Sequence, residues 1–109
     1  MNVEKSEVDG TVILSLEGHI GEAESQELEK ALSETFKAGS HRVVIDLSKV
    51  DFMTSSGLGV LLTMVAHAKD NDGFLRLANP QPLILQILRT TRLDNYFEVF
   101  GCVDEALKA

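Results

Sequence analysis

The expected fold is decided by two segments, Val43-Val44-Ile45-Asp46-Leu47 and Thr54-Ser55-Ser56-Gly57-Leu58-Gly59. The first is a nearly continuous aliphatic run, which is typical of a central β-strand covered on both faces. The second is a Ser/Gly turn that opens a predicted helix from Leu58 to about Lys69. Such a turn places hydroxyl groups and free backbone N–H groups at the positive end of a helix dipole. The sequence therefore predicts a site for an anion, either a bound phosphate or a phosphate attached to a serine.

The remaining elements are predicted from apolar periodicity and from turn residues. Strands are expected at residues 3–8, 11–17, 42–47, 74–78 and 97–100, and helices at residues 22–38, at 58–69, from a start within residues 79–82 and at 103–108. In the helix that starts within residues 79–82, Asn79 is a possible cap and the residues expected to face the core are Leu83, Ile84, Ile87 and Leu88. We expect Gly18 to end the second strand and residues 51–53 to form a link. The order ββαβαβαβα predicts one α/β domain over residues 1–109, with a mixed, mostly parallel sheet of four or five strands and about four helices. Functional residues in such sheets lie at the carboxyl ends of strands, where residues 54–59 are expected.

Composition excludes several functional classes. The formal net charge of −7, from 17 acidic and 10 basic residues without a basic run, makes nucleic acid a poor partner. Cys102 is the only cysteine, and the three histidines have no ligand spacing, so neither a disulfide nor a metal or other cofactor is expected. The sequence shows no signal peptide and no apolar run as long as a membrane span. We expect a cytoplasmic protein that is a monomer or a weak dimer.

The hydroxyl-rich turn does not match a catalytic motif. Gly57-x-Gly59 lacks the lysine and the third glycine of phosphate-binding loops, and Thr54 stands at the first glycine position of a hydrolase G-x-S-x-G elbow. No general acid–base pair is recognisable, so we do not expect an enzyme. The simplest interpretation of Ser55 and Ser56 is that they cap the helix.

One side of the predicted helix is a candidate interaction surface. Gly57, Val60, Met64 and His67 share a face away from the Leu58 side. If this face is exposed, its apolar groups are available to a partner. The alternative is a helix that is buried nearly all round.

The block "VVIDLSKVDFMTSSGLGVLL" resembles the signature of STAS domains, specifically the stand-alone anti-sigma factor antagonists of bacteria. The segments "LEGHIGEAESQELEKAL" and "FLRLANPQPLILQILRTTRLDNYFEVFGCVDEAL" are similar to the flanking parts of the family, so the resemblance covers nearly the whole chain. The central block is the specific part.

The resemblance implies a switch protein in transcription regulation that has no catalytic activity. In the family the second serine of the pair is phosphorylated by a serine kinase that is also the anti-sigma factor, and the unphosphorylated antagonist binds that kinase and releases the sigma factor. By position the acceptor is Ser56, with Ser55 and Thr54 as the next candidates. The expected partner-binding residues are Ser55, Ser56, Gly57, Leu58, Gly59, Val60 and Met64.

Two positions depart from the family pattern. Thr54 stands where the family usually has an aspartate before the serine pair, and Gly21 stands where it usually has another after the second strand. These departures favour an alternative within the same family, a STAS subunit of a lipid-transport complex or of a stress-sensor complex. A small phosphate-handling enzyme is a more distant alternative.

Overall fold

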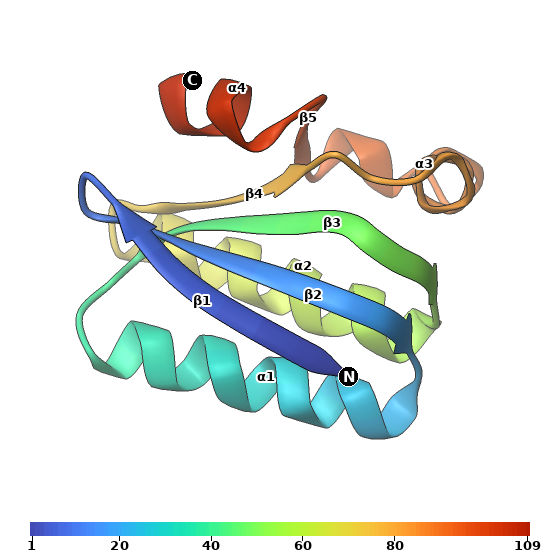
Figure 1. Ribbon diagram of the computed structural model, residues 1–109, viewed down its shortest axis with the longest axis horizontal. Coiled ribbons are helices and arrows are strands. Elements are labelled where there is room, and N and C mark those ends of the chain that lie inside the picture. Colours follow the sequence, from blue (N-terminus) through green and yellow to red (C-terminus); the bar gives the residue numbers. More distant parts are fainter.

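The computed structural model describes residues 1–109, and its five strands form one mixed sheet (Figure 1). The strands are β1 (Asn2–Val8), β2 (Thr11–Ile20), β3 (Arg42–Met53), β4 (Phe74–Ala78) and β5 (Glu98–Phe100), and they lie in the order β1-β2-β3-β4-β5. β1 is antiparallel to β2, and every other pair is parallel. The predicted α/β class, the element order and the single antiparallel edge are confirmed.

Four helices and one 3₁₀ turn cover the sheet: α1 (Glu22–Lys37), α2 (Ser55–Asp70), α3 (Pro82–Thr90), η1 (Leu93–Asn95) and α4 (Val103–Lys108). Figure 1 shows α1 below the strands, α2 behind β2 and β3, and α4 above β4. Side chains of α1, α2 and α3 share one buried cluster with Val43, Ile45 and Leu47. On the opposite face, Ala106 of α4 packs in a smaller cluster with Val44. The two faces of the sheet are therefore covered unequally.

The central position of β3 follows from its sequence. Val43, Val44, Ile45 and Leu47 are fully buried, because alternate residues of the strand enter the two clusters. β3 is paired with β2 on one side and with β4 on the other. The prediction of an interior strand with both neighbours paired is confirmed.

Two of the predicted element boundaries are wrong at the carboxyl end of the sheet. Gly18 does not end β2: it has a φ of +105° and lies within the strand, at a shift in the register between β2 and β3. Residues 51–53 are not a link, because Phe52 pairs with His19 and Met53 with Ile20. A glycine with positive φ can accommodate a bulge inside a strand, which the sequence alone does not distinguish from a strand end.

The starts of two helices differ in detail from those predicted. α2 begins at Ser55 rather than at Leu58, so both serines belong to the helix. In α3, Pro82 occupies the first turn, as expected, but the cap position is held by Gln81 and not by Asn79. Leu83, which the pattern places on the inner face of α3, is exposed.

Candidate functional site at the start of helix α2

Thr54 joins the start of α2 to the end of β2. Its backbone N–H donates to the carbonyl oxygen of Ile20 at 2.9 Å, and its Oγ1 hydroxyl donates to the same oxygen at 3.3 Å. Thr54 occupies the N-cap position, yet its side chain makes no capping hydrogen bond. The hydroxyl of Thr54 is therefore used to fix the turn against the sheet.

Ser55 and Ser56 are exposed residues of the first helical turn. Neither side chain is hydrogen-bonded to the protein, and the first intrahelical donor of α2 is the N–H of Leu58, which donates to the carbonyl of Thr54 at 3.1 Å. The N–H groups of Ser55, Ser56 and Gly57 precede that donor and have no intrahelical acceptor. The interpretation of the serines as helix caps is wrong. The site presents two free hydroxyls beside unpaired N–H groups.

The two glycines of the turn differ in their surroundings. Gly57 is buried, and a Cβ atom built on it would lie 2.8 Å from Cγ of Met53 and 3.0 Å from Cγ2 of Ile20. The absence of a side chain thus lets α2 approach the ends of β2 and β3 closely. A Cβ atom built on the exposed Gly59 would meet nothing within 4 Å. Gly59 leaves the backbone of α2 open to solvent.

Three of the expected partner-binding residues are not accessible. Gly57 is buried, Leu58 is 6% exposed and Met64 is 8% exposed, with Leu58 and Met64 both in the main core cluster. The expectation that Met64 lies on an exposed face is wrong, because α1 covers that side of α2. Val60 is half-buried and packs against the core. The accessible part of the expected surface is Ser55, Ser56, Gly59 and the outer edge of Val60.

The structure adds an aromatic pair to this edge of the sheet. The rings of His19 and Phe52 stack with centroids 5.0 Å apart and an interplanar angle of 16°. His19 is exposed and Phe52 is 37% exposed, at the ends of the strands that hold Thr54 in place. Sequence reasoning missed this pair because it treated residues 51–53 as a link. The pairing register, a tertiary feature, brings the two rings together.

The carboxylate of Glu24 lies beside Gly21. The N–H of Gly21 donates to Oε1 of Glu24 at 3.0 Å, and a Cβ atom built on Gly21 would lie 2.9 Å from that oxygen. The side chain of Glu24 therefore fills the space that a side chain of residue 21 would need. An acidic group from the first turn of α1 thus lies beside Gly21.

Two further properties bear on the chemistry of the chain. The structure contains no group of three or more His, Cys, Asp or Glu side chains arranged to hold a metal ion. None of its helices has both the length and the apolar character needed to cross a membrane.

A five-stranded mixed sheet whose third strand leads through a Ser/Ser/Gly turn into α2 defines a class of protein, the STAS domain. Residues 2–106 match this family, and the chain belongs to it. Over 109 residues the chain is 28% identical to BtrV of Bordetella bronchiseptica, which is named as a candidate anti-sigma factor antagonist; the match covers 100% of this chain and 94% of that protein.

Solved structures agree with this assignment. The crystal structure of an anti-sigma factor antagonist from Mycobacterium paratuberculosis superposes with a TM-score of 0.88 at 26% identity, covering 98% of this chain and 91% of that one. The phosphorylated form of SpoIIAA, a Bacillus cell fate determinant, superposes with a TM-score of 0.76 at 20% identity, covering 98% of this chain and 97% of that one. The SpoIIAA likeness concerns the fold alone.

Proposed function

We propose that this protein is an anti-sigma factor antagonist, a binding module without catalytic turnover. In its unphosphorylated form it docks a serine kinase that is also an anti-sigma factor, and the docking releases a sigma factor. Phosphorylation of Ser56 ends the interaction. The observation that supports this proposal best is the exposed Ser56 hydroxyl, which is free of hydrogen bonds at the start of α2.

Thr54, Ser55 and Ser56 differ in how accessible their hydroxyl groups are to a kinase. Thr54 is half-buried and its hydroxyl is hydrogen-bonded to Ile20, so a kinase would have to break that contact first. Ser55 and Ser56 are both exposed and free. The choice of Ser56 over Ser55 rests on its position in the family pattern, and Ser55 is the next candidate.

The local effect of a phosphate on Ser56 is expected to be mild. The phosphate would lie beside the unpaired N–H groups of the first turn and at the positive end of the helix dipole, which stabilises negative charge. The fold should therefore survive phosphorylation. The added charge of about −1.5 to −2 acts instead on the partner, which has packed against a neutral hydroxyl. Burying such a charge in a contact without cationic partners costs several kcal/mol, which corresponds to an affinity loss of roughly a thousandfold.

Incubation with the cognate kinase and ATP tests the proposal directly. We expect Ser56→Ala to bind the kinase constitutively and to accept no phosphate, and Ser56→Asp to bind weakly while keeping the melting temperature of the parent protein. Ser55→Ala is the comparison variant, because it removes the neighbouring free hydroxyl of the same turn but keeps the proposed acceptor, and it should still incorporate phosphate at Ser56. Phosphate incorporated equally into the Ser56→Ala protein would place the acceptor at Ser55 or Thr54.

A second candidate function is a STAS subunit of a lipid-transport complex or a stress-sensor complex that is not switched at this serine. The observation that favours it is the absence of an aspartate at both position 54 and position 21. Affinity purification from the native host distinguishes the two functions. Recovery of a histidine-kinase-like ATPase supports the antagonist, whereas recovery of a multi-subunit membrane or sensor assembly supports the alternative.

A further inference from the structure

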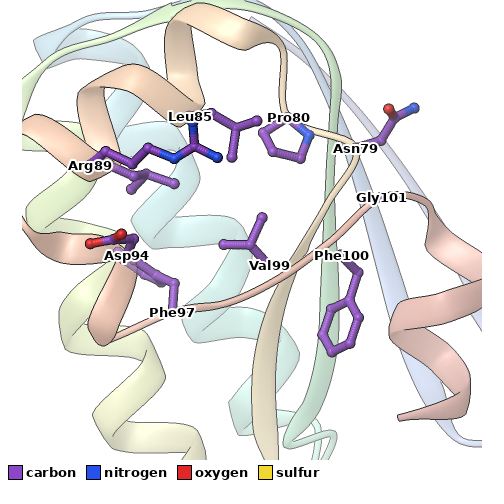
Figure 2. A pocket seen from close by; sticks show the side chains of 10 residues that line it. Asn79, Pro80, Leu85, Arg89, Asp94, Phe97, Val99, Phe100 and Gly101 are labelled. Carbon is purple, nitrogen blue, oxygen red and sulfur yellow. The ribbon is translucent and has the colours of Figure 1, made fainter.

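A hollow lies at the carboxyl ends of β4 and β5, and none of its lining residues belongs to the α2 turn. It has a volume of about 520 Å³. Its walls come from the β4–α3 loop, α3, η1 and β5, as Figure 2 shows, and its lining includes Leu85, Leu88, Arg89, Asp94, Phe97 and Val99. The volume falls in the range of small-molecule pockets, and the carboxyl ends of parallel strands are where α/β proteins bind ligands.

The backbone around the hollow is held in an unusual conformation. Arg92, which separates α3 from η1, has a φ of +60°, and Asn79 at the end of β4 has a φ of +55°. The N–H of Asn79 donates to the carbonyl of Phe100 at 2.8 Å, which ties the loop to β5. Positive φ is costly for an arginine, and it persists only where the surrounding structure imposes it. The β4–α3 loop is thus tied to β5 beside the hollow.

The lining combines an apolar floor with one available cation. Leu88 and Phe97 are buried, while Leu85 and Val99 are half-buried around the opening. The guanidinium of Arg89 takes part in none of the ion pairs of the protein. In Figure 2 this group extends over the hollow toward Leu85 and Pro80, whereas the carboxylate of Asp94 points outward. The hollow therefore offers apolar surface and a positive donor group on the same side.

From this arrangement we propose that the hollow binds a small organic carboxylate with an apolar body. The hydrocarbon part lies against Leu88, Phe97 and Val99, and the carboxylate accepts a bidentate pair of hydrogen bonds from Arg89. A planar guanidinium matches a carboxylate in this geometry, and charge-assisted pairs are stronger than neutral ones. A neutral compound of the same shape lacks that contact.

Titration of the full chain, followed by ¹H–¹⁵N NMR, tests the proposal with octanoate and 4-phenylbutyrate as probes and octan-1-ol as the neutral counterpart. We expect at least one of the two acids to shift the amide signals of Val99 and Gly101 in a saturable manner. The alcohol should bind about tenfold more weakly or worse. Arg89→Gln should lower the affinity for the acid about tenfold and leave that for the alcohol unchanged.

Arg42→Gln is the matched control, because it removes the same charge from an exposed residue of β3 outside the lining, and it should leave the affinity for the acid unchanged. The retained NMR spectrum shows that each variant is folded. The proposal is overturned if neither acid shifts these signals at millimolar concentrations. It is equally overturned if the alcohol binds as well as the acid, or if Arg89→Gln and Arg42→Gln have the same effect.

Discussion

At the scale of single residues, the two glycines of the α2 turn should respond to alanine in opposite directions. A methyl group at Gly57 would overlap Met53 and Ile20, so Gly57→Ala should lower the free energy of unfolding by about 1–3 kcal/mol. Gly59 has open space around it and lies in a helix, where alanine is favoured over glycine. Gly59→Ala should therefore raise the free energy of unfolding by about 0.5–1 kcal/mol. Urea denaturation of the two variants measures both changes, and equal effects would contradict this account of the turn.

At the scale of elements, α2 packs on the sheet beside α1, so its outer side is only partly available. Phe36 of α1 stacks on His67 with ring centroids 4.8 Å apart and lines a small hollow together with Met64. An aspartate at position 64 would place a buried charge in this contact. Met64→Asp should lower the melting temperature by about 10 °C or more, whereas Met64→Leu should change the free energy of unfolding by less than about 1.5 kcal/mol.

Ala66→Asp adds the same charge to α2 at an exposed position and serves as the control. Thermal unfolding followed by circular dichroism compares the three variants. A Met64→Asp protein with an unchanged melting temperature would restore the interpretation of Met64 as a surface residue.

At the scale of the whole molecule, the sheet has one extensive core and one small one. Three helices cover the first face, whereas the small cluster of Ile13, Val44, Ala78 and Ala106 on the other face depends on α4. Ala106 is fully buried, so Ala106→Asp should detach α4 and lower the free energy of unfolding by about 2–3 kcal/mol. The main core should persist, with NMR shift changes confined to α4 and the strands beneath it.

The exposed Lys108 provides the matched control for that variant. Lys108→Asp places an aspartate on the same short helix without burying it, and it should leave stability nearly unchanged. Global unfolding of the Ala106→Asp protein would show that the two clusters form one cooperative unit.

The sequence by itself determined the element order, the class of the sheet and the central place of β3. These properties follow from local patterns, because the aliphatic run of residues 43–47 is typical of a strand covered on both faces, and the Ser/Gly turn after this strand marks its carboxyl end. The position of residues 54–59 at the carboxyl end of a central strand was predicted for the same reason, and the structure places them after β3 at the start of α2.

Only the tertiary structure decided which apolar and polar groups are accessible. On β2, Ile13 is buried in the cluster that includes Ala106 of α4. On the same face of the strand, Ser15 is half-buried and Glu17 is exposed. Met64 is covered because α1 packs beside α2, and the stacked rings of His19 and Phe52 meet because of the strand register. Each of these outcomes depends on contacts between segments distant in the chain. The periodicity of one segment shows that it has an apolar face, but it does not show how far a neighbouring element extends over that face.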